Sequence, residues 1–163
     1  MFPDDIDQLA RHVLDLARAS GSMVTTVESC TGGLVAGALT AISGSSDVVD
    51  RGFVTYSNAA KTALVGVPEA LIAKHGAVSA QVARAMAEGA VKITGTAVAV
   101  SVTGVAGPTG GTAEKPVGLV HFAVARVGGK TIHREERFGD LGREAVRLAA
   151  VRAALQMLAK ALA

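Results

Sequence analysis

A short apolar segment at residues 23–27 leads into the turn Glu28-Ser29-Cys30-Thr31-Gly32-Gly33, and a helical pattern begins near Leu34. A strand, a glycine turn and a helix N-terminus together present unpaired backbone N–H groups to whatever occupies the turn. In open α/β sheets, the loop after a parallel strand is also where ligands bind. These residues therefore predict an α/β protein with a pocket for an anion or an oxyanion beside Ser29.

The composition suits such a sheet. The chain has 163 residues, and half of them are apolar, which is enough for one continuous core. Aromatic residues make up only 3% and tryptophan is absent, so Ala, Val, Leu and Ile must fill the interior. Such residues are typical of parallel strands that are covered by helices. We therefore expect a single domain over residues 1–163.

Periodic patterns predict the remaining elements. Apolar residues at helical spacing predict helices at 6–19, 34–42, 59–64, 68–75, 79–93 and 143–162. Apolar and β-branched runs predict strands at 23–27, 48–56 and 96–103, and a hairpin of strands 117–127 and 131–138. Residues 43–46 and 104–118 are expected to be loops. The predicted architecture is a mixed β-sheet with helices on both faces, a three-layer α/β/α fold in which strand 96–103 is central.

Charge and cysteine content exclude several functions. The 16 basic and 14 acidic residues are spread along the chain, without the basic stripe of a nucleic-acid-binding protein. Cys30 is the only cysteine, and no His, Cys, Asp or Glu grouping has metal-ligand spacing. No segment has the roughly 20 apolar residues of a membrane span, and the acidic start is unlike a secretory signal. We therefore expect a cytoplasmic protein with no metal, no nucleic-acid partner and no membrane contact.

Three roles are open to Ser29 at the mouth of the predicted pocket. It could cap the helix, bind a phosphate, or attack a carbonyl whose oxygen the N–H groups stabilise. The residues around it do not form the Gly-x-Ser-x-Gly elbow of α/β-hydrolases, because Val27 and Glu28 precede the serine. From these residues alone, a structural role is favoured over a nucleophilic one.

A nucleophilic serine needs a base, and the four histidines occupy positions typical of surface or packing residues. Lys61 lies in an Ala-rich helical turn, and it would act as a base only if burial lowered its pKa. The alternative for Lys61 is a solvated side chain. Tyr56, the only tyrosine, could relay a proton between Ser29 and Lys61, contact the substrate, or simply cover the sheet edge.

The segment after strand 96–103 is a second candidate for ligand binding. Thr103, Gly104 and Gly107 begin a loop whose backbone N–H groups can approach a ligand closely. The segment lacks the Gly-Lys-Ser/Thr ending of a P-loop and the glycine spacing of a dinucleotide fingerprint, which disfavours ATP and NAD. Arg143 could clamp a phosphate or a carboxylate, or could be an ordinary arginine of the last helix.

Several motifs, taken in order, resemble the CinA C-terminal domain family over nearly the whole chain. They are Glu28-Ser-Cys-Thr-Gly-Gly33, Tyr56-Ser-Asn58 with Lys61, Leu64-Val-Gly-Val-Pro68, His75-Gly-Ala-Val-Ser79 and Thr103-Gly-Val-Ala-Gly-Pro108. Characterised members of this family are nicotinamide-nucleotide amidases. The resemblance implies hydrolysis of the carboxamide of nicotinamide mononucleotide to nicotinate mononucleotide and ammonia, a salvage step for pyridine nucleotides that needs no cofactor.

The resemblance also implies roles for individual residues. Ser29 resembles the nucleophile, Lys61 its base, and Tyr56 a partner in proton transfer. The remaining residues would bind substrate, with the N–H groups of the first four holding the oxyanion: Cys30, Thr31, Gly32, Gly33, Thr103, Gly104, Gly107 and Arg143. In the family an arginine commonly follows the Gly-Asp pair directly, whereas Leu141-Gly142 separates Arg143 from that pair here. Arg137 and Arg147 are therefore alternatives for the role of Arg143. Glu28 has no assigned role.

Two further expectations concern function and assembly. The alternative to an amidase is a non-catalytic nucleotide-binding or regulatory module, linked to competence or to the response to DNA damage. We expect a homodimer, because helices rich in Ala and Gly can pack against a second copy as well as against the sheet.

Overall fold

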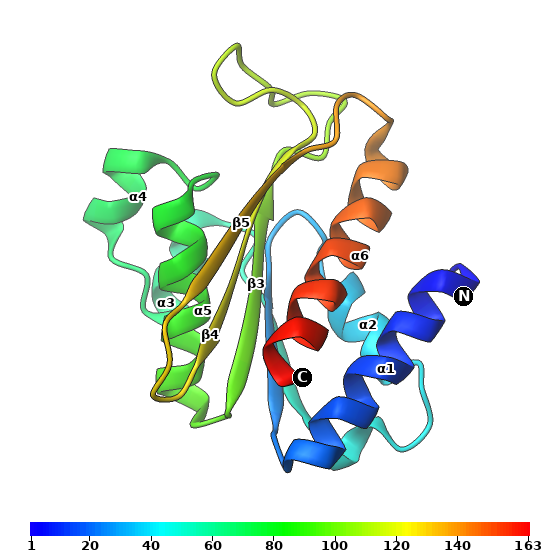
Figure 1. Cartoon of the computed structure of the whole chain (residues 1–163). Helices are drawn as coiled ribbons and strands as arrows, with labels where there is room; N and C mark the ends of the chain where they lie inside the picture. The colour runs from blue at the N-terminus through cyan, green and yellow to red at the C-terminus, as the bar shows by residue number, and fades with distance from the viewer.

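Helices and strands alternate along most of the chain in the computed structural model, which describes residues 1–163 (Figure 1). The elements, in order, are α1 (Asp4–Ser20), β1 (Val24–Glu28), α2 (Leu34–Thr40), the 3-10 helix η1 (Ser45–Asp47), β2 (Val49–Val54), α3 (Asn58–Val65), α4 (Glu69–His75), α5 (Ala80–Thr94), β3 (Val98–Gly104), β4 (Leu119–Arg126), β5 (Ile132–Arg137) and α6 (Arg143–Leu162). Every predicted helix and strand is present, although several end a residue or two away from the predicted limits.

The structure differs from the predicted elements in two local details. Strand β3 begins at Val98 rather than at residue 96, because the hydroxyl of Thr96 donates to the hydroxyl of Thr25 at 3.1 Å and holds a turn after Gly95. The segment 43–46 was predicted as a loop, but its second half belongs to η1. Neither difference changes the order of the strands.

The five strands form one mixed sheet in the order β2-β1-β3-β4-β5. Strand β1 pairs in parallel with β2 and β3, whereas β4 pairs antiparallel with β3 and β5. The prediction that β3 is central is therefore confirmed. Glu28, the last residue of β1, lies opposite Val54 of β2 and Val102 of β3, so these strands end at one edge of the sheet.

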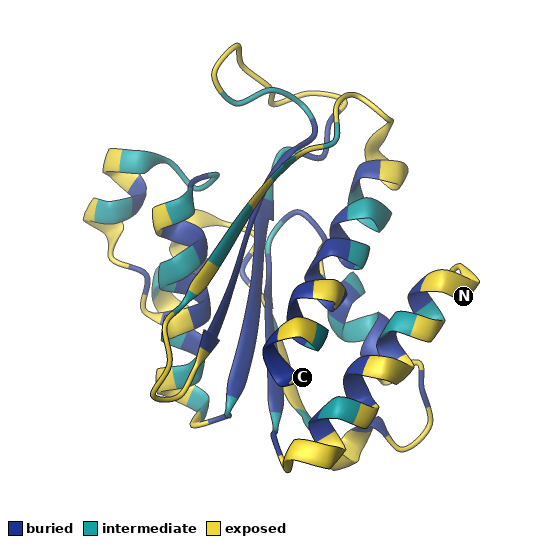
Figure 2. Cartoon of the chain, in the orientation of Figure 1, coloured by how far each residue is buried: buried dark blue, intermediate teal, exposed yellow.

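Helices cover both faces of the sheet, which confirms the three-layer α/β/α prediction (Figure 1). Helices α1, α2 and α6 pack on one face around a core that includes Val100 and Phe122, and α3, α4 and α5 lie on the other. Strands β1, β3 and β4 are buried almost throughout (Figure 2). No helix has the length and apolar character that crossing a membrane would require.

Helix α5 approaches the sheet closely because the facing residues are small. Ala83 and Ala87 of the helix pack against Ala123 and Ala125 of β4. Gly89 allows an equally close approach between α5 and α3, since a Cβ at this position would lie 1.8 Å from the carbonyl oxygen of Val65. Alanine and glycine thus let α5 pack close to the sheet and to α3.

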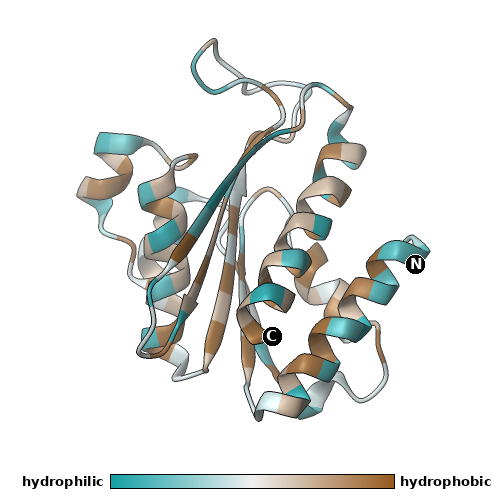
Figure 3. Ribbon diagram, viewed as in Figure 1, coloured by the Kyte–Doolittle hydropathy of each residue, from teal (hydrophilic) through white to brown (hydrophobic).

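The two edge strands are the least apolar part of the sheet. Strand β5 is largely hydrophilic (Figure 3), and it carries the ion pairs Arg134–Glu136 and Arg137–Glu135. Strand β2, at the opposite edge, carries the exposed pair Asp50–Arg51. Charged side chains therefore border the sheet on both sides.

Candidate active site

The turn after β1 holds the hydroxyl of Ser29 at the carboxyl edge of the parallel strands. The N–H of Ser29 donates to the carbonyl of Val102 at 2.9 Å, which extends the pairing of β1 with β3 by one residue. Gly32 and Gly33 follow with φ angles of +58° and +99°, a left-handed backbone that favours glycine, and α2 begins at the next residue. The chain thus reverses sharply and leaves Ser29 half-buried beside the sheet.

Lys61 reaches Ser29 from α3. Its Nζ lies 3.2 Å from Oγ of Ser29 and donates to the carbonyl of Thr55 at 2.9 Å. The lysine is only 1% exposed, and no carboxylate forms an ion pair with it. Burial lowers the pKa of Lys61 from its ordinary value of 10.5, because the charged ammonium loses its hydration. The structure therefore brings together a hydroxyl and an amine that burial shifts toward its neutral form.

The backbone N–H groups of the turn are not all available to a ligand. The N–H of Gly32 donates to the carbonyl of Ser29 at 3.0 Å, and the N–H of Gly33 donates to the carboxylate of Glu28 at 3.1 Å. The N–H groups of Cys30 and Thr31 have no partner in the protein. Of the four residues expected to hold an oxyanion, Gly32 and Gly33 therefore form the bend, and Thr31 is completely buried outside the pocket lining. Cys30 is the one residue of the four that lines the pocket with its N–H free.

Ser29 opens into a pocket of about 300 Å³ between the turn and the glycine-rich loop after β3. Its lining residues are Ser29, Cys30, Tyr56, Val78, Gly104, Val105, Ala106, Gly107, Thr109, Gly110 and Arg143. A larger hollow of about 880 Å³, between the N-terminus and the start of α6, shares Arg143 but contains neither Ser29 nor Lys61. The smaller pocket is therefore the candidate site.

Tyr56 lies at the pocket but does not join Ser29 to Lys61. Its hydroxyl accepts a hydrogen bond from Arg143 at 3.0 Å, and the side chain is 61% exposed. Lys61 and Ser29 are within hydrogen-bond distance of each other without it. The structure thus does not place Tyr56 as the relay that the sequence suggested, and instead pairs it with an arginine of the pocket wall.

Among the three arginines considered for the substrate, the pocket contains Arg143. Its guanidinium also donates to the carbonyl of Gly107 at 2.9 Å, so it ties α6 to the glycine-rich loop. Arg147 lies on the other side of the turn, where it donates to the carbonyls of Cys30 at 3.1 Å and Thr31 at 3.0 Å. Arg137 forms an ion pair with Glu135 on β5 and does not line the pocket.

The residues at the end of β3 divide into two groups. Gly104 and Gly107 line the pocket, as expected, and a Cβ on Gly104 would lie 2.7 Å from the carbonyl oxygen of Leu119. Thr103 is only 1% exposed, and its hydroxyl donates to the carbonyl of Ala77 at 2.8 Å. Thr103 therefore does not line the pocket, and its hydroxyl instead holds the connection from α4 to α5.

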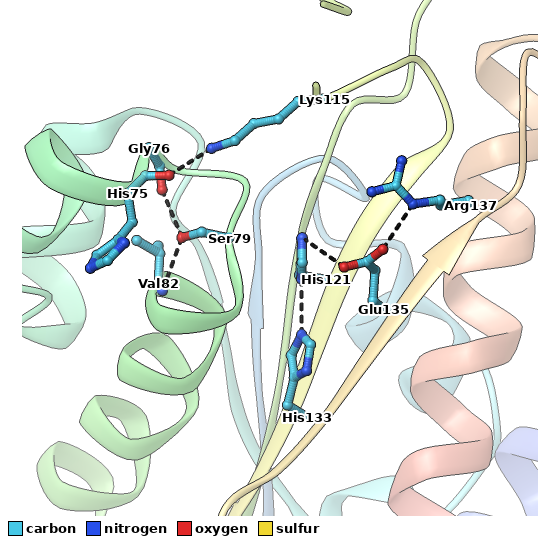
Figure 4. Close-up of polar contacts among 9 residues, drawn as sticks. All are labelled: His75, Gly76, Ser79, Val82, Lys115, His121, His133, Glu135 and Arg137. Atoms are coloured by element: carbon cyan, nitrogen blue, oxygen red, sulfur yellow. Dashed lines mark hydrogen bonds and ion pairs between the residues drawn. The ribbon is translucent and has the colours of Figure 1, made fainter. Parts of the chain in front are cut away.

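No histidine lines the pocket. His121 and His133 stack on the neighbouring strands β4 and β5, with Nδ1 of the first 2.9 Å from Nε2 of the second (Figure 4). Figure 4 also shows Lys115, from the glycine-rich loop, donating to the carbonyl of His75 at 2.6 Å. No group of three or more His, Cys, Asp or Glu residues has an arrangement that could hold a metal ion. Lys61 is therefore the only basic side chain in contact with Ser29.

One residue of the turn was missed by the sequence analysis. Glu28 is completely buried, and its carboxylate accepts hydrogen bonds from the N–H groups of Gly33, Val35 and Ala36 at 3.1, 3.0 and 2.8 Å. A signal for this role was present, since an acidic residue just before a helix N-terminus is favoured there by the free N–H groups and the helix dipole.

Comparison with known proteins identifies the family. The chain is 51% identical over 159 residues to the nicotinamide-nucleotide amidohydrolase PncC of Escherichia coli K12, covering 97% of this chain and 95% of that protein. It is 49% identical to a CinA-like protein of Anaeromyxobacter dehalogenans, of whose length it spans only 39%. The crystal structure of the competence/damage inducible protein CihA from Agrobacterium tumefaciens superposes with a TM-score of 0.96 at 56% identity, covering 99% of this chain and 98% of that one. Because the sequence profile of the CinA C-terminal domain also matches residues 6–162, the chain belongs to the CinA C-terminal domain family.

Proposed function

We propose that this protein is an amidohydrolase that converts nicotinamide mononucleotide to nicotinate mononucleotide and ammonia. The observation that carries the proposal is the buried Lys61 amine 3.2 Å from the Ser29 hydroxyl, beside the free backbone N–H of Cys30. Such a set can activate a serine and stabilise the oxyanion of acyl transfer. The Escherichia coli relative, which matches nearly end to end, and a relative from Enterobacter agglomerans that is 55% identical over 140 residues both bear the name nicotinamide-nucleotide amidohydrolase.

In the proposed reaction, Ser29 attacks the carboxamide carbon while neutral Lys61 takes the hydroxyl proton. The carbonyl oxygen becomes an oxyanion that accepts a hydrogen bond from the N–H of Cys30. When the intermediate collapses, Lys61 gives its proton to the nitrogen, the C–N bond breaks, and ammonia leaves an ester on Ser29. Lys61 then deprotonates a water molecule that attacks the ester, which releases the carboxylic acid and restores the serine.

The rest of the pocket suits the remainder of a nucleotide substrate. Arg143 uses one N–H group on Gly107 and another on Tyr56, and its guanidinium has further donors available. A planar guanidinium can bind a phosphate through two hydrogen bonds at once. We therefore propose that Arg143 binds the phosphate of the substrate, while Tyr56 holds the guanidinium in place.

The test is the release of ammonia from nicotinamide mononucleotide by the purified protein and by Ser29→Ala and Lys61→Met. Both substitutions should reduce the release to the uncatalysed background. Lys74→Met and Ser46→Ala, which alter exposed residues outside the pocket, should retain wild-type rates. Unchanged release by the Ser29→Ala protein would refute the serine mechanism. If the wild type bound the nucleotide but released no ammonia, the chain would instead be a nucleotide-binding module.

A further inference from the structure

Glu28 and Arg147 lie on the two sides of the turn that carries Ser29, and neither is used in the proposed reaction. Glu28 contacts the turn from the start of α2, through the N–H groups of Gly33, Val35 and Ala36. Arg147 contacts it from α6, through the carbonyls of Cys30 and Thr31. No opposite charge pairs with either residue, so their hydrogen bonds to the backbone are their main polar contacts.

The carboxylate of Glu28 accepts hydrogen bonds from the backbone N–H groups at the start of α2. The cap residue Gly33 has no side chain that could accept hydrogen bonds from the first turn of the helix. The carboxylate takes three N–H groups, and the N–H of Leu34 donates to the carbonyl of Thr31 at 3.1 Å. An anion that is part of the chain therefore occupies the donors that would otherwise attract the negative oxygen of a ligand. Within the turn, only the N–H groups of Cys30 and Thr31 remain free.

Cys30 is the residue of the turn whose free N–H lies at the pocket, because Thr31 is completely buried. Arg147 fixes the peptide unit that follows Cys30. This unit is planar, and the guanidinium of Arg147 holds its carbonyl at 3.1 Å. Arg147 therefore restrains Cys30 from its C-terminal side.

The peptide unit that precedes Cys30 is fixed by the turn itself. The carbonyl of Ser29 and the N–H of Cys30 share this unit, and that carbonyl accepts the N–H of Gly32 at 3.0 Å. The position of Gly32 depends in turn on Gly33, which Glu28 holds at 3.1 Å. Cys30 therefore lies between two held peptide units, one held by Arg147 and one by the bend that Glu28 closes, and its N–H has a fixed direction.

We infer that Glu28 and Arg147 are positioning residues that aim the N–H of Cys30 at the oxyanion, an inference that rests on the proposed amide hydrolysis. Neither side chain touches the reacting atoms. Glu28 removes competing donors and closes the turn on one side of Cys30, and Arg147 holds the carbonyl of Cys30 on the other side. Because an oxyanion exists only during the reaction, loss of either residue should lower kcat and leave KM nearly unchanged.

The test compares Glu28→Ala and Arg147→Met with Ser101→Ala. Ser101 is the matched control, since its completely buried hydroxyl donates to the carbonyl of Ala83 at 2.6 Å and does not line the pocket. Rates are measured per folded molecule, at a temperature where circular dichroism shows all proteins folded. We expect kcat to fall about 100-fold in both test variants, as for the loss or misplacement of an oxyanion donor. The control should lose stability and keep its kcat.

Sodium formate provides a second readout, because formate can fill the space of the missing carboxylate. It should restore part of the kcat of Glu28→Ala and raise its unfolding temperature, whereas sodium chloride at equal ionic strength should do neither. If Glu28→Ala or Arg147→Met does not fold, Glu28→Gln and Arg147→Lys replace them, with the same expected fall in kcat at constant KM. Unchanged kcat per folded molecule would overturn the inference.

The two proposals fail in different ways. If the wild-type protein releases no ammonia, the amidase proposal fails. The inference for Glu28 then depends on the unfolding temperature of Glu28→Ala alone, and the absence of any specific effect of formate would overturn it. If the wild type is active and both variants retain its kcat, only the inference about Glu28 and Arg147 is wrong.

Discussion

Arg143 donates a hydrogen bond to the hydroxyl of Tyr56 at 3.0 Å, across 87 positions of the sequence. The same guanidinium donates to the carbonyl of Gly107, so it joins the chain after β2, the glycine-rich loop and α6 at the mouth of the pocket. The shape of the pocket mouth therefore depends on the hydrogen bond between Arg143 and Tyr56.

Tyr56→Phe should lower kcat/KM about tenfold, because a hydrogen bond to a charged group is worth about 1.5 kcal/mol or more and Arg143 would lose its lateral support. The unfolding temperature should stay the same, since the tyrosine is 61% exposed. Steady-state kinetics and thermal unfolding check both values. Val127→Ala, at a residue 65% exposed on the distant hairpin turn, should change neither quantity. A fall in kcat as large as that of Ser29→Ala would show instead that Tyr56 takes part in the proton transfers.

The pH profile of kcat/KM should report Lys61. Only the neutral amine can accept the proton of Ser29, so the rate should rise with pH and level off above the pKa of Lys61. Burial lowers that pKa below 10.5, so the plateau should begin below this value. Stopped assays of ammonia across the alkaline range give the profile. An apparent pKa at or above 10.5 would mean that Lys61 is not the base.

Lys115→Met should raise KM about fivefold with little change in kcat. The ammonium of Lys115 donates to the carbonyl of His75 at 2.6 Å, which links the glycine-rich loop to the connection that carries Val78 (Figure 4). Loss of a hydrogen bond worth about 1 kcal/mol should loosen two walls of the pocket without moving Ser29 or Lys61. Lys130→Met, at an exposed lysine of the hairpin turn, is the matched control. Equal KM values in the two variants would contradict a role for this link.

Replacing each of two helical glycines by alanine should change the stability of the protein in opposite directions. In Gly89→Ala the new Cβ would meet the carbonyl oxygen of Val65 at 1.8 Å, so α3 and α5 must separate and the unfolding temperature should fall by several degrees. In Gly37→Ala the nearest atom is a ring carbon of Phe2 at 3.5 Å, an ordinary contact. This variant should gain about 0.5–1 kcal/mol from helix propensity. Calorimetry of both proteins is the measurement, and similar unfolding temperatures would refute the close packing of α5.

The stacked histidines should make stability depend on pH. Burial lowers the pKa of both His121 and His133 below 6.5; the partner imidazole lowers that of His121 further and Arg84 that of His133, while Glu135 partly opposes both shifts. The unfolded chain therefore binds protons at a higher pH than the folded one. The contribution of the neutral histidines to the free energy of unfolding is fully present above pH 6.5 and is lost as the pH falls below this value. Urea unfolding at pH 7.5 and pH 5.5 should show the loss, and His133→Gln should reduce it. A wild type equally stable at both values would refute the prediction.

Much of the fold followed from local patterns, because each helix and strand buries one regular set of apolar side chains. The alanine-rich runs at α5 and β3 are examples, since their burial follows directly from their composition. The meeting of Ser29 with Lys61 was different. Their spacing of 32 positions contains no information about contact, so residue types could only suggest Lys61 as one possible base, and the resemblance to a family favoured the pair.

The hydrogen-bond partners inside the turn could not be predicted from the sequence. Which N–H groups stay free depends on the φ angles of Gly32 and Gly33 and on the reach of the Glu28 side chain. The partners of Thr103 and Tyr56 depend on how other segments pack against β3 and α6. Residue types predicted a pocket beside Ser29, and the structure has a pocket there. They could not show that the N–H groups of Gly32 and Gly33 bond within the protein or that Thr31 is completely buried.

The charged borders of the sheet have a consequence for how copies of this protein can associate. An unpaired edge strand can recruit a strand from another chain, and charged side chains along the edge oppose this. With Arg134, Glu136 and their neighbours along β5 and the Asp50–Arg51 pair on β2, both ends of the strand order resist such growth. These charges thereby oppose the edge-to-edge polymerisation of crowded molecules.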